Sequence, residues 1–227
     1  MLRIVVLFLC FCVCHVERSS SQPIHWGVSA GASIHELDFE APLDFWDASN
    51  RSFPSVMLHM ELPMRFIEGP LGELLWLSSG VRYTRLASKV DFENEVGNGN
   101  QLFTGAFRIN QHYVAIPVQF RLDLGKLPVF IVAGPEFGVL VYANKISETF
   151  TPVEFRSSDT RKITGDLKRV NTSLYGGIGV EFKKGVALYG RFGRGLNHVL
   201  KGGDQTVSVS DWLTNEFEIG LKVDFER

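Results

Sequence analysis

Apolar and polar residues alternate through a long stretch at the centre of the chain, Tyr113–Tyr142. Every second residue is apolar from Val114 to Leu122, and the pattern resumes between Val129 and Val141 after a turn that contains Gly125. Because successive side chains of a β-strand point to opposite sides, this spacing predicts a hairpin whose two strands each have one apolar face. A chain organised around such a hairpin is expected to fold as a β-sheet.

The same alternation recurs in six further segments, which brings the predicted number of strands to eight: 24–34, 55–66, 75–87, 172–182, 186–194 and 215–226, with the two strands of the hairpin. The connections after the even-numbered strands are tight: Glu68–Gly72, Asp123–Lys126 and Lys183–Gly185. Those after the odd-numbered strands are long and polar: His35–Phe53, Ser88–His112, Asn144–Asn171 and Gly195–Thr214. Regular alternation of short and long connections along the chain is typical of outer-membrane barrels. We therefore predict an all-β, eight-stranded antiparallel up-and-down transmembrane barrel with short periplasmic turns and four long external loops.

The central hairpin also carries a family resemblance. Its first strand reads Tyr-x-x-Ile-Pro-Val-x-Phe from Tyr113, and its second reads Pro-Val-Phe-Ile-Val-Ala-Gly-Pro-x-x-Gly from Pro128. These motifs resemble the central hairpin of the PorT-like outer-membrane β-barrel proteins of Bacteroidetes-type bacteria. The resemblance extends loosely from Trp26 to Phe225, and it implies a barrel scaffold. Some relatives in that family serve protein secretion across the outer membrane.

The first 21 residues have the pattern of an export signal. Arg3 precedes an apolar run from Ile4 to Cys14, and small residues stand at Ser19 and Ser21, as expected for cleavage before Gln22. We expect a signal peptide over 1–21 and one barrel domain over 22–227. All three cysteines lie in the signal segment, so neither disulfides nor a thiolate metal site are expected in the barrel domain.

Alternation alone does not say which face of the barrel is apolar, because a soluble lipocalin-like barrel alternates with its apolar face inside. The polar faces here are rich in small residues such as Gly27, Ser29 and Gly177, which suit a crowded lumen. The apolar face of the last strand ends at an aromatic residue, Phe225, as in many outer-membrane barrels. These features favour the membrane barrel. The alternative is a soluble periplasmic or secreted barrel that binds a small apolar ligand.

Charged residues of both signs fall on the polar strand faces: Glu61, Arg65, Arg82, Arg121, Glu136, Glu181, Arg191, Glu216 and Lys222. The lumen of an eight-stranded barrel is filled by side chains and has no open pore. We therefore interpret these residues as a paired structural network that fixes the barrel, in preference to a path for protons or ions.

The first long loop interleaves aromatic and acidic residues. Its candidates for an interaction surface are Phe39, Asp44, Phe45, Trp46 and Asp47. Aromatic and acidic side chains together suit a protein, a glycan or a cation, and they equally suit a loop that folds over the barrel mouth.

A second alternative is an outer-membrane lipid-modifying enzyme. His59 and Glu61 share a strand face, Ser78 lies on the next strand, and His112 is a further possible base. Spacing shows only the shared face, so we expect no catalytic residue here. The sequence shows no convincing metal spacing and indicates no cofactor. With 23 Lys and Arg against 25 Asp and Glu, it also lacks the basic surface that nucleic acid requires.

These observations favour a non-enzymatic role without a cofactor in the cell outer membrane, which the chain reaches through a cleaved signal peptide. The expected surroundings are outer-membrane lipid and another envelope protein bound through the external loops. The barrel itself is expected to be monomeric, and its role that of a structural or interaction scaffold.

Overall fold

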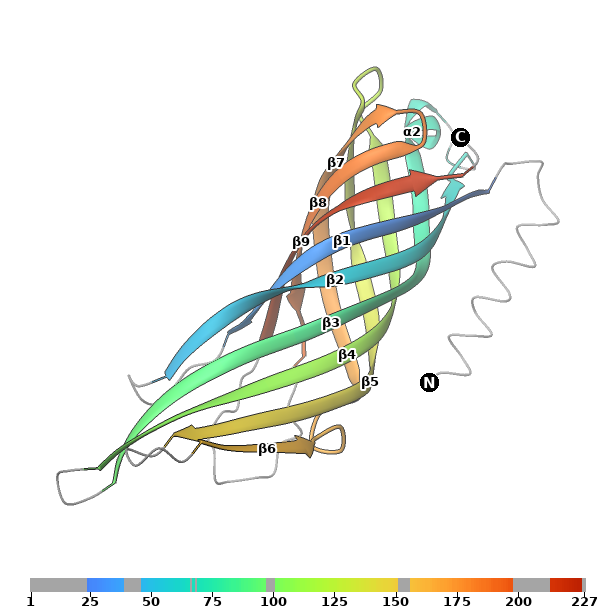
Figure 1. Ribbon diagram of the computed structural model, residues 1–227. Helices are drawn as coiled ribbons and strands as arrows, with labels where there is room; N and C mark the ends of the chain where they lie inside the picture. The colour runs from blue at the N-terminus through green and yellow to red at the C-terminus, as the bar shows by residue number, and fades with distance from the viewer. Residues whose placement is uncertain are drawn as a thin grey trace.

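The computed structural model describes residues 24–38, 46–65, 67, 69–96, 101–150, 156–197 and 213–225. Figure 1 shows the arrangement of its elements. They are β1 (His25–Asp38), β2 (Trp46–Pro63), α2 (Pro70–Leu74), β3 (Leu75–Val96), β4 (Gln101–Asp123), β5 (Val129–Phe150), β6 (Arg156–Lys162), β7 (Val170–Lys183), β8 (Val186–Gly195) and β9 (Leu213–Asp224). Among these residues no helix is both long and apolar enough to span a membrane. The expected signal peptide lies outside the described residues.

The sheet closes into a barrel through eight of its nine strands, in the order β1-β2-β3-β4-β5-β7-β8-β9. Every neighbouring pair is antiparallel, and β9 pairs with β1 to complete the ring. This seam runs from Gly27 paired with Asp224 to Asp38 paired with Leu213. Closure leaves the barrel wall without an unpaired edge, which a structure surrounded by lipid requires. The predicted eight-stranded barrel is confirmed.

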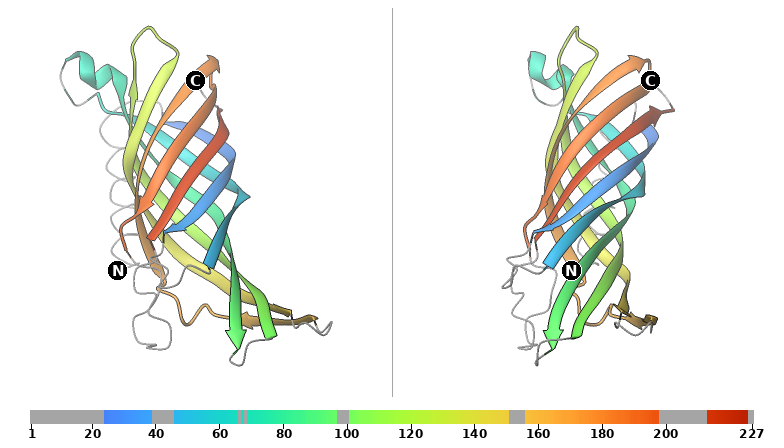
Figure 2. Two further views of the ribbon diagram at one scale, coloured as in Figure 1. Left: turned by 90° about the vertical axis from the view of Figure 1, so that its left-hand side faces the viewer. Right: turned by 60° about the vertical axis from the view of Figure 1, so that its left-hand side comes forward.

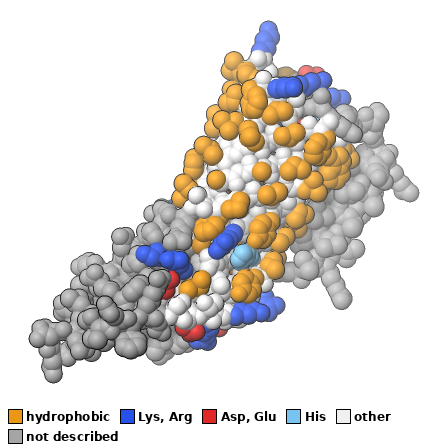
Figure 3. All heavy atoms as spheres, viewed as in Figure 1, with side chains coloured by type: hydrophobic (Ala, Val, Ile, Leu, Met, Phe, Trp, Pro, Cys, Tyr) orange, Lys and Arg blue, Asp and Glu red, His pale blue; other side chains and the backbone are white. Residues whose placement is uncertain are grey.

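The apolar faces of the strands point outward. Leu58, Ile178 and Phe192 are each more than half exposed, although they belong to the regular apolar alternation. In Figure 3 such side chains form a band over the barrel wall. The interior instead buries charge, since Arg82 is 0% exposed and Glu218 1% exposed. The alternative of a soluble barrel with an apolar ligand cavity is therefore wrong.

Four strands continue past the end of the barrel wall, where long loops were expected. β3 and β4 stay paired up to Val96 and Gln101, so the expected loop Ser88–His112 is mostly a hairpin. β5 reaches Phe150 and then pairs with β6, within the expected loop Asn144–Asn171. The reason is visible in the sequence, because Val90 and Phe92 alternate with charged residues and keep the period of a strand.

These continuations form an open sheet outside the barrel, made of the outer parts of β2, β3, β4 and β5 together with β6. We call it the external sheet. It exists because β5 pairs with β7 only as far as Val139, and beyond that point its partners are β4 and β6. Figure 2 shows it leaning away from the barrel axis.

The opposite end of the barrel carries the tight connections, and we call it the turn end. Gly125 and Gly185 adopt φ values of 66° and 76°, which glycine tolerates and which make these turns possible. The β2–β3 connection is less simple than predicted, because Pro70 begins the single-turn helix α2.

Candidate functional site

The buried charged side chains gather in two groups inside the barrel. The middle layer consists of Arg82, Glu136, Arg191, Glu216 and Glu218, with the hydroxyls of Tyr175 and Tyr189. The turn-end layer consists of Glu61, Arg121, Lys222 and Asp224, with His59, Asp123 and Glu181 around them. Both layers join strands that are not neighbours in the wall.

In the middle layer, Arg82 on β3 reaches across the lumen. Its Nη1 donates to Glu136 Oε1 on β5 at 2.8 Å, and its Nη2 donates to Glu218 Oε2 on β9 at 2.6 Å. It also donates to Glu216. From β8, Arg191 Nη2 donates to the same Oε2 of Glu218 at 2.9 Å. One guanidinium thus links three carboxylates on two strands, which blocks the centre of the barrel.

The turn-end layer repeats this arrangement nearer the tight connections. Glu61 on β2 accepts a hydrogen bond from Arg121 Nη1 at 2.9 Å and another from Lys222 Nζ at 2.5 Å. His59 Nε2 donates to Asp224 Oδ1 at 2.8 Å, and Lys222 Nζ lies 3.4 Å from the other oxygen of Asp224. Since both oxygens of each of these two carboxylates have a nitrogen partner, the burial of their charge is compensated.

Aromatic rings pack against the buried cations, and glycines make room for the rings. Arg121 lies 4.1 Å from the ring centre of Phe130, and Arg191 lies 4.7 Å from that of Tyr175. A Cβ added at Gly179 would overlap the Phe130 ring, and one at Gly193 would overlap the Tyr175 ring. Gly179 and Gly193 therefore make room for the rings that pack against the charge layers.

Of the nine charged residues that the sequence placed on the polar faces, the structure brings together eight. Arg65 does not join them, because β2 ends at Pro63 and Arg65 is exposed in the following turn. Glu218, Asp224, Tyr175 and His59 take part in the layers, although the sequence analysis did not include them in the charge network. Period-two counting on their strands puts each of them on the polar face, so a signal for them existed.

The proposed interaction surface of the first loop lies mostly beyond what the structure describes. Phe39, Asp44 and Phe45 are outside the described residues. Trp46 and Asp47 belong to β2, where they pair with Phe92 and Asp91 of β3. At these two positions the expected loop is part of the external sheet.

The histidines considered for catalysis occupy separate environments. His59 is 1% exposed and engaged with Asp224, while Glu61 is engaged with Arg121 and Lys222. A nucleophile, a base and an orienting group must lie within hydrogen-bond reach of one another to form a triad.

Elsewhere on β4, His112 Nδ1 lies 2.6 Å from the hydroxyl of Tyr83, whose side chain is 43% exposed. Neither histidine is therefore placed in a triad by the contacts of the described side chains. In this part of the chain, no group of three or more His, Cys, Asp or Glu residues is arranged to hold a metal ion.

Comparison with known proteins agrees with this architecture. The outer membrane protein beta-barrel domain family matches residues 18–201. A search of curated proteins found no match.

Among solved structures, the chain is similar to Neisserial surface protein A, with 11% identity, coverage of 90% of this chain and 100% of that one, and a TM-score of 0.41. It is also similar to Ail of Yersinia pestis, with 11% identity, coverage of 89% and 99%, and a TM-score of 0.39. CarO2 of Acinetobacter baumannii gives 10% identity, coverage of 88% and 99%, and a TM-score of 0.40.

The family match covers most of the chain, and the barrel has an apolar exterior and a buried, ion-paired interior. The chain belongs to the outer membrane protein beta-barrel domain family and is an integral outer-membrane β-barrel protein.

Proposed function

We propose that this barrel is a non-enzymatic scaffold whose external sheet binds another protein of the cell envelope. The observation that carries the proposal is the continuation of β2, β3, β4 and β5 beyond the closed wall, where β6 adds a further strand. A hairpin that only crosses a bilayer needs strands of roughly 9–11 residues, and β3 and β4 have 22 and 23. About half of each strand is thus available to build a surface outside the membrane.

The orientation follows from the connections. Outer-membrane barrels place short turns in the periplasm and longer connections outside the cell. This rule puts the turn end in the periplasm and the external sheet at the cell surface. It also agrees with an exported chain whose signal peptide is removed before the barrel is inserted.

The two charge layers support a scaffold in preference to a channel. Arg82 and Arg121 are 0% and 2% exposed, and each bridges strands across the lumen. An eight-stranded barrel leaves an interior that side chains can fill. We assign the layers a structural role, which is to hold the strands in one register and to close the lumen.

Absence of catalysis is likewise part of the proposal. The strongest catalytic alternative places His59 or His112 at the reaction centre. His59 is enclosed within the turn-end layer, away from the lipid-facing wall where an acyl chain would lie.

The PorT-like resemblance of the central hairpin favours an assembly role, and we propose an envelope or secretion assembly as the setting.

Site-specific photo-crosslinking in cells tests the external sheet. A photoreactive residue at Asn94, on the outer part of β3, is compared with one at Leu127 in a tight turn. We expect one envelope protein to crosslink from Asn94 and not from Leu127. A shortened variant provides a second test. It joins Ser88 to Ile109, which are paired in the hairpin, through Asn-Gly. With the photoreactive residue at Trp46 in the shortened and the full-length chain, the shortened variant should lose the crosslinked partner while its barrel still folds. Equal crosslinking from Asn94 and Leu127 would refute the proposed surface.

A further inference from the structure

Three exposed lysines line a cleft at the turn end of the barrel. Lys126 belongs to the β4–β5 turn, Lys183 is the last residue of β7, and Lys184 belongs to the β7–β8 turn. The cleft between these turns has a volume of about 450 Å³. In Figure 3, basic side chains are visible at this end of the apolar band.

The two turns are fixed to each other, so the cleft is part of the fold. Glu181 N donates to Pro128 O at 2.7 Å, which joins the end of β7 to the β4–β5 turn, and Gly185 N donates to Glu181 Oε1 at 3.1 Å within the β7–β8 connection. Because β5 and β7 are neighbours in the wall, these bonds hold the lysines of both turns at the same edge.

The cleft has an excess of positive charge. Its lining includes Arg121 and the three lysines, against only two carboxylates, Asp123 and Glu181, which leaves a formal charge of +2. Both carboxylates contact Arg121, at 2.8 and 3.4 Å. Within the described part of the chain, none of the three lysines is ion-paired. Their ammonium groups therefore remain available to an anion.

Exposed apolar residues stand beside the lysines and lead to the lipid-facing wall. Leu127 is 62% exposed and Phe182 is 64% exposed, and the outward row of β7 continues through Val180 and Ile178. A ligand over the lysines thus sits at the margin of the surface that acyl chains cover. A phospholipid has this combination of a phosphate and adjoining apolar chains.

We propose that this cleft binds the headgroup phosphate of an anionic glycerophospholipid whose acyl chains lie against the apolar band beside Phe182. Lys126, Lys183 and Lys184 supply the positive charge, and Leu127 with Phe182 contacts the upper part of the chains. A basic residue near a membrane surface contributes about 1 kcal/mol toward binding an anionic headgroup, which corresponds to about a fivefold change in affinity for each lysine.

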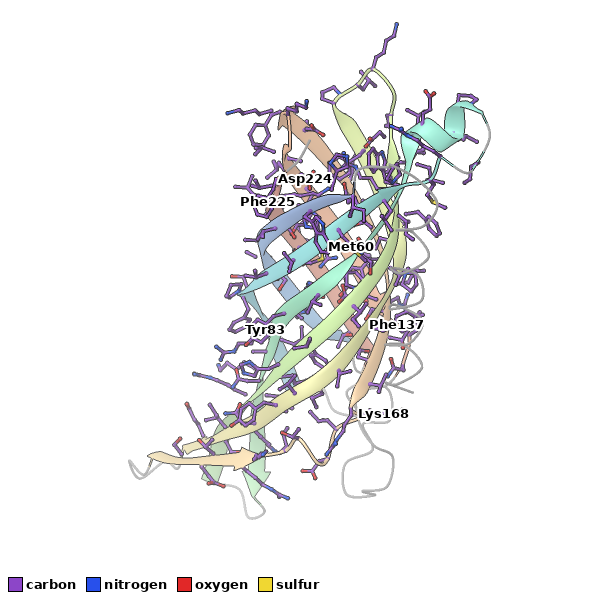
Figure 4. The ribbon with its side chains drawn as sticks, turned by 90° about the vertical axis from the view of Figure 1, so that its right-hand side faces the viewer. Met60, Tyr83, Phe137, Lys168, Asp224 and Phe225 are labelled. Atoms are coloured by element: carbon purple, nitrogen blue, oxygen red, sulfur yellow. The ribbon has the colours of Figure 1, made fainter. Side chains whose placement is uncertain are left out.

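Native mass spectrometry of the refolded full-length barrel tests this site. The probes are phosphatidylglycerol and phosphatidylcholine with identical acyl chains. The test variant is K183S/K184S. The matched control is K162S/K168S, which removes the same charge at the other end of the barrel, where Figure 4 shows Lys168 far from Asp224 and Phe225. Migration that changes on boiling shows that each variant has folded.

We expect wild type and the control to bind one phosphatidylglycerol in preference to phosphatidylcholine. The K183S/K184S variant should bind phosphatidylglycerol about tenfold to thirtyfold more weakly. Equal losses in the two variants, or equal binding of the two lipids by wild type, would overturn the proposal. Displacement of the lipid by inorganic phosphate would assign the cleft to a soluble anion, and displacement by a polyglutamate peptide would assign it to an acidic protein; either result overturns it as well.

Discussion

Replacing Arg82 by methionine tests whether the middle layer holds the barrel together. The substitution keeps a long side chain and removes the one guanidinium that contacts Glu136, Glu216 and Glu218. After the change, Arg191 is the cation of the layer that still pairs with Glu218 at 2.9 Å, and its Nη1 lies 3.6 Å from Glu136. Removing one partner of a buried ion pair costs about 3–5 kcal/mol, because the remaining charge stays desolvated. We expect R82M to lose that much free energy of unfolding.

The matched control is R161M on β6. Arg161 lies 3.9 Å from Asp166, with side chains 75% and 59% exposed, so its loss should cost no more than about 1 kcal/mol. Urea unfolding of both variants in lipid vesicles, followed by tryptophan fluorescence, gives the comparison. A second variant, R82M/E216Q, removes one of the charges left behind and should recover part of the stability. If R82M and R161M unfold within about 1 kcal/mol of each other, the structural role of the middle layer is refuted.

Other substitutions and assays test separate parts of the structure. G193V places a side chain where the ring of Tyr175 lies and should destabilise the barrel by about 1–3 kcal/mol in the same urea assay, whereas no loss would show that the ring has room to move. L58R puts a cation on the lipid-facing wall and should cost up to about 2–4 kcal/mol, while L58F should be tolerated. Purified barrel in a planar bilayer should give no steady conductance, because the layers close the lumen; reproducible open steps would contradict this. The variant H59A/H112A should leave envelope lipid composition unchanged, and a new lipid species or a missing one would revive the enzymatic alternative.

The faces of the strands were predictable because a barrel wall imposes a period of two on every strand. Counting along β9 from Glu216 places Glu218, Lys222 and Asp224 on the same face, and the structure buries all four. The pairing between them was not predictable. Contact between Arg82 and Glu216 depends on how the strands tilt and stagger across the lumen, and spacing along one strand does not determine that stagger.

The ends of the strands were predicted less well than their faces. Polar sequence after Ala87 was interpreted as loop, yet a hairpin that leaves the membrane can remain paired while its side chains become charged, because backbone hydrogen bonds sustain it. At Arg65 the strand was predicted to be too long rather than too short. This residue continues the spacing of Glu61 and Pro63, but the strand ends before reaching it. Periodicity identifies a face and does not show where pairing stops.

The interior contacts also bear on how the chain is assembled. Arg82 and Glu216 are 134 residues apart in sequence, and Glu61 and Lys222 are 161 apart. Arg82 can pair with Glu136 and Glu61 with Arg121 among the earlier strands, but each lacks its partners on β9 until β9 docks beside β1. Such non-local contacts slow folding, and they couple full neutralisation of the buried charges to closure of the barrel. The last twelve residues of the wall, β9, therefore complete both charge layers in the same step that closes the barrel.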